Sequence, residues 1–307
     1  MSAHHQKRES HRGIRLIIIA SILWGTVGIA TQAIYHRSDM TAITVGFYRI
    51  ALAVPFVVAF SCMTVGWRGL LVSRCHLPRM AMIGAMLAFY QVCYFSAISY
   101  VGVAVATLVT LCSAPAIVAL LSIVWLNERL TRQTLLALTF ALVGTCLLVG
   151  MPDAVVARGD LLTGVLLALG SATGYAIVTL VGKSLSGQVD PIHSTTVSFA
   201  VGALCLLPLA LVDGMTLKMP LEIWGLLGYI GLVPTATAYF CFFAAMRHVK
   251  ASTASVITLL EPLTATLLAW VLFDERLGIV GMCGALLLMT AIGVLYRAND
   301  GNGAGDT

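Results

Sequence analysis

The sequence predicts an all-α membrane protein with ten transmembrane helices, arranged as two inverted five-helix repeats. Three observations support this fold class: the composition, ten long apolar stretches, and an internal repeat. Of the 307 residues, 59% are hydrophobic and only 10% are charged, and the mean hydropathy is +0.96. Soluble domains carry about 25% charged residues. The composition therefore excludes soluble enzymes, nucleic-acid-binding domains and disordered proteins.

A helix that crosses a bilayer needs about 20 mostly apolar residues. The chain contains ten such stretches, at 14–34, 41–61, 79–100, 103–125, 132–150, 160–182, 193–213, 222–246, 251–273 and 278–296. We assign residues 14–150 to the first repeat and 160–296 to the second, with 1–13 and 297–307 as cytoplasmic tails. The basic N-terminus resembles a signal peptide, but no small-residue cleavage site follows it. The first stretch is therefore interpreted as a spanning helix.

The basic residues indicate the orientation of the chain. With the N-terminus inside, thirteen of the 18 Lys and Arg residues fall on the inner side and four on the outer side, while Arg49 lies within the second span. Cytoplasmic loops carry an excess of Lys and Arg. This bias predicts that both termini are cytoplasmic, and it supports ten spans, because deleting one span would scramble the sides of the later loops.

An internal repeat links the two halves of the chain. Residues 104–130 and 251–277 share nine identities in 27 aligned pairs, among them Pro115 with Pro262 and the ends Asn127-Glu128-Arg129-Leu130 with Asp274-Glu275-Arg276-Leu277. Each half holds five predicted spans, so the two copies must cross the membrane in opposite directions. Inverted repeats are typical of secondary transporters, whose substrate site lies near the midplane between the repeats.

Several motifs carry a family resemblance. They are Trp24-Gly25 in the first span, Phe47-Tyr48-Arg49 in the second, Tyr94-Phe95 in the third, the two Glu-Arg-Leu ends, and Glu261-Pro262 in the ninth. The sequence resembles the EamA branch of the drug/metabolite transporter superfamily over nearly its whole length. The resemblance implies a ten-span carrier of the bacterial inner membrane, commonly an exporter of amino acids or other small metabolites. It does not identify the substrate.

Two full charges lie deep within predicted spans. Polar groups in the hydrocarbon region are costly, so each is a candidate functional residue. Glu261 could carry a proton, because a carboxylate in a partly dry cavity takes one up more readily than in water. It could instead bind a substrate ammonium group or serve only as a structural acid. Arg49 could hold a substrate carboxylate, or reach toward the interface and pair helices.

Aromatic and hydroxyl side chains fall on single faces of several spans and could enclose one amphipathic cavity. The predicted substrate-binding residues are Trp24, Thr31, Tyr90, Gln91, Tyr94, Tyr175, Tyr239 and Thr258. Hydrogen bonding between helices by Ser and Thr is the alternative interpretation. Pro115 and Pro262 are predicted hinges, because proline removes an amide donor and kinks a helix.

Sequence motifs give no sign of an enzyme. The histidines form no HExxH pattern, no GxSxG turn occurs, and no Walker or Rossmann glycine pattern is found. The eight cysteines show no CxxC spacing and are interpreted as small buried residues rather than metal ligands or disulfides. We therefore expect no catalytic residues, metal or cofactor.

The expected partners are a small-molecule substrate and the lipid bilayer, without nucleic acid. Stripes of small residues such as Gly281–Ala285 would pack repeats or the protomers of a homodimer. The leading hypothesis is an exporter that works by alternating access, with proton coupling open. An uncoupled uniporter or an importer is the alternative, and a channel or an intramembrane enzyme is a remote one.

Overall fold

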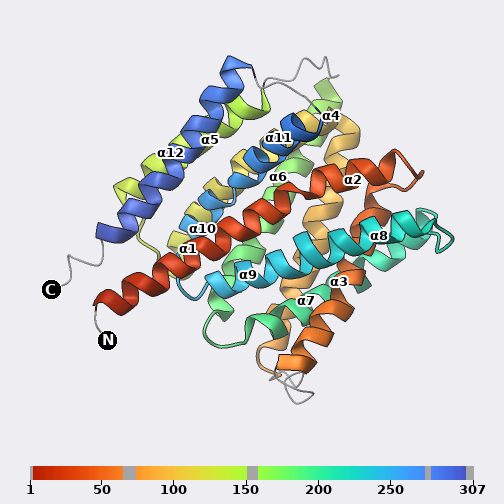
Figure 1. The fold of residues 1–307 in the computed structure, drawn as a ribbon, viewed down its shortest axis with the longest axis horizontal. Helices are drawn as coiled ribbons and strands as arrows, with labels where there is room; N and C mark the ends of the chain where they lie inside the picture. The colour runs from red at the N-terminus through yellow and green to blue at the C-terminus, as the bar shows by residue number, and fades with distance from the viewer. Residues whose placement is uncertain (1–2, 65–73, 151–157, 274–277, 302–307) are drawn as a thin grey trace.

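A computed structural model describes residues 3–64, 74–150, 158–273 and 278–301, and every regular element in these ranges is a helix. Most helices run along one common direction, and the two termini lie at the same end of the molecule (Figure 1). The predicted all-helical membrane fold is confirmed. The elements of the first half are α1 (Ala3–Gly25), α2 (Val27–Tyr35), α3 (Ala42–Thr64), α4 (Leu77–Leu126) and α5 (Arg132–Val149).

The second half contains shorter pieces, because two of its predicted spans are divided. Its elements are α6 (Arg158–Leu185), α7 (Pro191–Val212), α8 (Leu221–Ile230), the π-helix η2 (Gly231–Thr237), α9 (Ala238–Ala245), α10 (Ala251–Ile257), α11 (Leu260–Phe273) and α12 (Ile279–Gly301). Residues 3–13 of the predicted N-terminal tail are helical, because α1 begins at Ala3 and continues into the first predicted span. The repeated end 274–277 lies outside the described residues.

Nine helical segments of the described residues are long and apolar enough to cross a membrane. One of them, α4, has 50 residues and contains the third and fourth predicted spans. Its backbone leaves helical geometry at Gly102, with φ +77° and ψ +167°. The hydroxyls of Tyr94 and Thr107 are only 2.7 Å apart, whereas 13 residues of straight helix would cover about 20 Å. The helix therefore folds back at Gly102, and each half is one predicted span.

Three predicted spans are interrupted or irregular near their middles. The first has a single-residue turn at Thr26, between α1 and α2, and the eighth contains the π-helix η2 around Pro234. The ninth is broken at Thr258–Leu259. Pro262 explains that break, because it has no N–H to donate to the carbonyl of Thr258 and the amide of Glu261 bonds there instead.

Glycines allow the broken helices to approach each other closely. A Cβ at Gly25 would lie 2.6 Å from the Cβ of Thr264 and 2.9 Å from the carbonyl oxygen of Glu261. The end of α1 is thus packed directly against the first two turns of α11, which follow the break in the ninth span. Gly144 of α5 and Gly284 of α12 make a similar backbone contact between the two halves of the chain. The small-residue stripe at 281–285 therefore contributes to packing between the halves.

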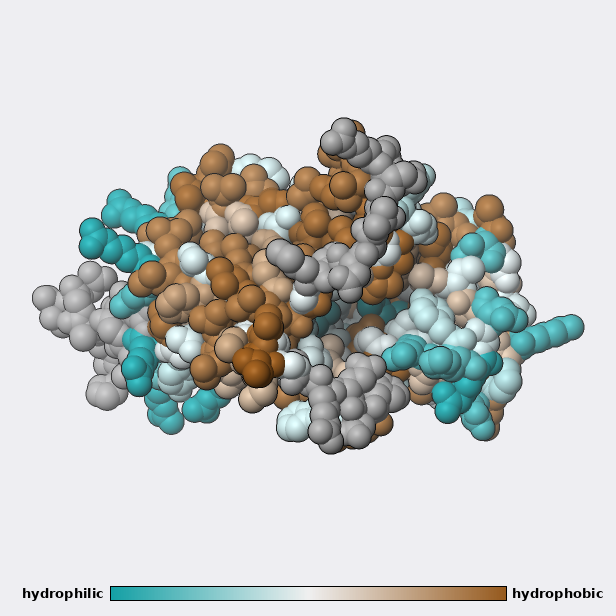
Figure 2. All heavy atoms as spheres, turned by 90° about the horizontal axis from the view of Figure 1, so that it is seen from above, coloured by the Kyte–Doolittle hydropathy of each residue, from teal (hydrophilic) through white to brown (hydrophobic). Residues whose placement is uncertain are grey.

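The surface fits a protein that crosses a membrane several times. Large apolar side chains such as Leu120, Val124, Trp270 and Met282 are exposed. On the face that Figure 2 shows, hydrophobic residues cover most of the middle, and hydrophilic residues gather toward the two ends. Such a belt would be unstable in water and matches the hydrocarbon region of a bilayer.

Candidate functional site

A cavity of about 750 Å³ lies at the centre of the helices, within the range of sites for small molecules. Its walls come from α1, α2, α3, both halves of α4, α6, α9, α11 and the break between α10 and α11. Both halves of the chain therefore contribute to it. The fold places the site where the interrupted spans meet.

The cavity opens toward the end of the molecule that is opposite the two termini. Its lining includes Gln32 and Tyr35 at the end of α2, Ala42 at the start of α3, and Ser99 and Val103 on either side of the fold-back in α4. Helical segments end or begin at these positions, so they mark the mouth. We call this end the open end and the other the closed end.

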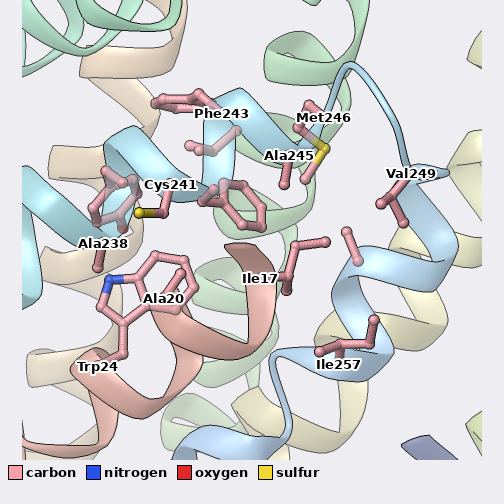
Figure 3. Close-up of a cluster of buried hydrophobic side chains, with 14 of the residues drawn as sticks. Ile17, Ala20, Trp24, Ala238, Cys241, Phe243, Ala245, Met246, Val249 and Ile257 are labelled. Carbon is pink, nitrogen blue, oxygen red and sulfur yellow. The ribbon is translucent and has the colours of Figure 1, made fainter. Parts of the chain in front are cut away.

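Aromatic rings form the floor of the cavity. The hydroxyls of Tyr90 and Tyr239 are 2.8 Å apart, and the Trp24 ring meets Tyr239 edge-on at 5.0 Å. Tyr175 donates a hydrogen bond to the Thr258 hydroxyl at 3.3 Å. Below this floor, Ile17 and Ala20 of α1 pack against α9 and α10 in a cluster of buried apolar side chains (Figure 3). This cluster closes the end that carries the termini.

Arg49 and Gln91 form a polar pair in the cavity wall. Nη2 of Arg49 donates to Oε1 of Gln91 at 3.1 Å, while Nε of Arg49 and Nε2 of Gln91 are buried donors without a hydrogen-bond partner. Gly46 makes this arrangement possible, since any Cβ at that position would overlap the amide nitrogen of Gln91. Arg49 and Gln91 both line the cavity, although these two nitrogen atoms are themselves buried in its wall. A guanidinium in a cavity wall is suited to bind an acceptor such as a carboxylate.

Glu261 lies in the first turn of α11, directly after the break in the ninth span, and its residue lines the cavity. Among the hydrogen bonds of the described residues, none involves its carboxylate. The Arg49 guanidinium is close enough to interact electrostatically with it. The cavity therefore contains one acidic and one basic group.

The cavity brings together eleven of the twelve residues singled out from the sequence. They are Trp24, Thr31, Arg49, Tyr90, Gln91, Tyr94, Pro115, Tyr175, Tyr239, Thr258 and Glu261. The twelfth, Pro262, is outside the lining. Pro115 lies inside an uninterrupted helical stretch, whereas Pro262 follows a break. The binding and hinge roles of these residues remain predictions.

Sequence reasoning missed part of the lining. Thr107 and Thr110 belong to the second half of α4, where Thr107 is bonded to Tyr94 and the hydroxyl of Thr110 donates to the carbonyl of Ala168 at 3.3 Å. Positions 107, 110 and 114 are three and four residues apart, the spacing of one helix face, and this pattern could have identified them. Gly46 gave no signal, because its importance depends on a contact with another span.

Comparison with known proteins agrees with this architecture. The profile of the EamA-like transporter family matches residues 11–150 and 162–297.

The chain belongs to the EamA-like transporter family.

It is similar to the "Uncharacterized transporter YwfM" of Bacillus subtilis, with 32% identity over 285 residues, covering 92% of this chain and 93% of that protein. It is also similar to the "Uncharacterized inner membrane transporter YicL" of Salmonella typhimurium, with 25% identity, covering 92% and 94%. A solved crystal structure superposes with a TM-score of 0.82 at 18% identity, over 94% of this chain and 98% of that one, which shows the shared fold. The protein is a multi-pass membrane transporter.

Relatives named as transporters fit the expectation that this EamA protein is not an enzyme. Within the described ranges, no group of three or more His, Cys, Asp or Glu side chains is placed to hold a metal ion.

Proposed function

We propose that this protein is a secondary transporter of the bacterial inner membrane that exports amino acids or other small amphipathic metabolites by alternating access. The observation that carries the proposal is the central cavity, with one acid, one base and aromatic walls. The membrane assignment is supported by the similarity to YicL, which is named an inner membrane transporter. The excess of basic residues on the side of the termini supports cytoplasmic termini.

The charges in the cavity favour a zwitterionic substrate. A charge transferred from water into a protein cavity must be paired, because an unpaired buried charge is costly. The Arg49 guanidinium, which lines the cavity, would pair with a substrate carboxylate. The Glu261 carboxylate, which has no hydrogen-bond partner among the described residues, would accept from an ammonium group. Trp24 and the tyrosines of the floor supply an apolar surface for a side chain.

The helix breaks favour a carrier over a channel. In secondary transporters, interrupted helices meet near the midplane and one set of helices rocks against another. Here the first span turns at Thr26, the ninth is broken, and the two are in contact at Gly25. The cavity is lined at one end by the mouth residues and ends at the other against a buried apolar cluster. Such a single-sided cavity is expected of one state in an alternating-access cycle.

Glu261 is the proposed coupling residue. A carboxylate that lines the cavity next to a helix break can exchange a proton with water in the cavity and can also respond to the substrate. In the uncoupled alternative, Glu261 binds substrate only and the protein equilibrates its substrate. An importer would use the same site in the opposite direction.

Transport by the purified protein in proteoliposomes tests the proposal. Vesicles loaded with one unlabelled amino acid at a time should take up the labelled form by saturable counterflow. A carrier shows this exchange and a channel does not. Absence of counterflow for all common amino acids would overturn the proposed substrate class.

The coupling step needs a second measurement. Glu261→Gln keeps the shape of the side chain and removes its charge, so accumulation driven by a pH gradient should be lost. Glu222→Gln is the matched control, because Glu222 lies in the first turn of α8 outside the cavity. Normal gradient-driven accumulation by Glu261→Gln would disprove coupling through this residue.

A further inference from the structure

The corner between α9 and α10, at the closed end, is held by two opposite charges, one from α6 and one from the loop that follows α4. Lys183 of α6 donates from Nζ to the carbonyl oxygens of Met246 and Val249, both at 2.7 Å. Glu128 accepts from the amides of Ala251 and Ser252 at 2.7 and 3.3 Å, and from the Ser252 hydroxyl at 2.9 Å. The corner is therefore fixed on both of its sides.

Each charge has the sign that its end of the corner requires. The last carbonyls of a helix and the first amides of a helix have no partner within that helix. Lys183 supplies donors to the carbonyls after α9, and Glu128 supplies acceptors to the amides of α10. Lys250, the N-cap residue directly before α10, makes no side-chain capping bond, so the capping group comes from Glu128 in the loop after α4. Lys250 instead donates to the carbonyl of Arg129, next to Glu128.

The two contacts differ in what they join. Lys183 and its partners all belong to the second half of the chain, so this contact makes the corner part of that half. Glu128 belongs to the first half and Ala251 to the second. Its carboxylate is thus a tie between the halves, placed at the end of α4 beyond the cavity.

The contact between Glu128 and the start of α10 joins, at the closed end, two segments that lead to the cavity. The second half of α4 lines the cavity through Thr110 and Pro115 and then runs to Glu128. Starting at Ala251, α10 leads to Thr258, which lines the cavity, and to the break before Glu261. Opening the closed end requires a path between helices that now meet in the cluster of Figure 3. Separating α4 from α10 would break all three hydrogen bonds of Glu128.

We propose that Glu128 is a positioning residue for transport. Its carboxylate holds the end of α4 against the start of α10 while the cavity is open at the other end, and its hydrogen bonds must break before the closed end opens. This inference rests on the alternating-access part of the proposed function. It adds a residue outside the cavity that sets the equilibrium between two states: one in which the cavity opens at the open end, as here, and one in which it opens at the opposite end. Weakening the hydrogen bonds of Glu128 should shift this equilibrium toward the second state.

Two reporter cysteines can detect this shift in the full-length protein after its eight native cysteines are replaced. Ile257→Cys places a thiol in the cluster that shuts the closed end, where Ile257 is fully buried. Ala42→Cys places a thiol in the lining near the mouth. The probe is a small water-soluble methanethiosulfonate reagent, applied to purified protein so that it reaches both ends.

Glu128→Gln should raise the labelling rate at position 257 by about tenfold and lower the rate at position 42. In Glu128→Gln one carboxylate oxygen becomes an NH2 group, which cannot accept a hydrogen bond, and the remaining oxygen no longer carries charge, so at least one of the bonds to Ala251 and Ser252 is lost. Loss of a hydrogen bond to a charged group changes a conformational equilibrium by about tenfold or more. Ser252→Ala removes one of the three bonds and should change both rates in the same directions by a smaller factor. Glu222→Gln, the matched control at the other end of the molecule, should change neither rate.

The opposite changes at the two positions distinguish a tie from a purely structural contact. If Glu128 only stabilises the fold, its loss raises both rates together, and that result overturns the proposal. Unchanged rates in both Glu128→Gln and Ser252→Ala overturn it as well. Labelling needs no substrate, so failure of amino-acid counterflow in the parent protein would refute the substrate class without affecting this test.

Discussion

Gly46→Ala is the substitution that most directly tests the polar pair in the cavity wall. The new Cβ would overlap Nε2 of Gln91, a side chain that is only 2% exposed. Gln91 must then move, and its 3.1 Å hydrogen bond from Arg49 is lost. The variant therefore perturbs the pair without removing either of its members.

The magnitude follows from these contacts. Overpacking a buried site costs about 1–3 kcal/mol, and a hydrogen bond to a charged group contributes about 1.5–3 kcal/mol. We expect Gly46→Ala to lower the free energy of unfolding by about 1–3 kcal/mol. If Arg49 and Gln91 bind a substrate carboxylate, the half-saturation concentration for counterflow should also rise by about tenfold.

A double-mutant cycle in thermal or denaturant unfolding of the purified protein isolates the clash. In a Gln91→Ala background, the next atom near the new Cβ is Cε2 of Phe95 at 3.3 Å, which needs only a small adjustment. Gly46→Ala should then cost far less than it does in the parent. Gly28→Ala is the matched control, because it lines the same cavity and its Cβ would meet no atom within 4 Å. Equal costs for Gly46→Ala in both backgrounds would refute this reasoning.

Two further predictions concern other contacts. Burial lowers the pKa of His248 below its ordinary value of 6.5, although Glu9 at 2.9 Å opposes the shift. The folded state thus binds this proton less tightly than the unfolded chain, so the free energy of unfolding should fall as the pH drops through about 6.5. His248→Gln should make the melting temperature depend less steeply on pH. An unchanged pH dependence would contradict the lowered pKa of His248. Thr107→Val removes the 2.7 Å hydrogen bond to Tyr94 that joins the two halves of α4, and it should lower the free energy of unfolding by about 1 kcal/mol. Thr139→Val is the control: its exposed hydroxyl bonds only within its own helix, so the free energy of unfolding should fall by less.

Much of the site was predictable because polar groups are expensive in a membrane. A side chain such as Arg49 or Glu261 in an apolar span must face another polar group or a cavity. That argument alone selected residues which the fold places around one cavity. It did not apply to the two repeated prolines, whose surroundings differ: Pro262 follows a break and Pro115 lies within a continuous helical stretch. Whether a helix opens at a proline depends on neighbours that can satisfy the freed backbone groups.

The sequence by itself determined the membrane class, the approximate spans, the duplication and the short set of polar residues within the spans. These are properties of local stretches, because hydropathy and the spacing of residues along one helix need no knowledge of the other helices. Only the tertiary structure decided which end of the cavity is open, that Gly46 makes room for Gln91, and that Glu128 caps a helix of the opposite half. Each of these depends on contacts between spans far apart in the chain, where packing distances of a few ångströms decide which groups meet.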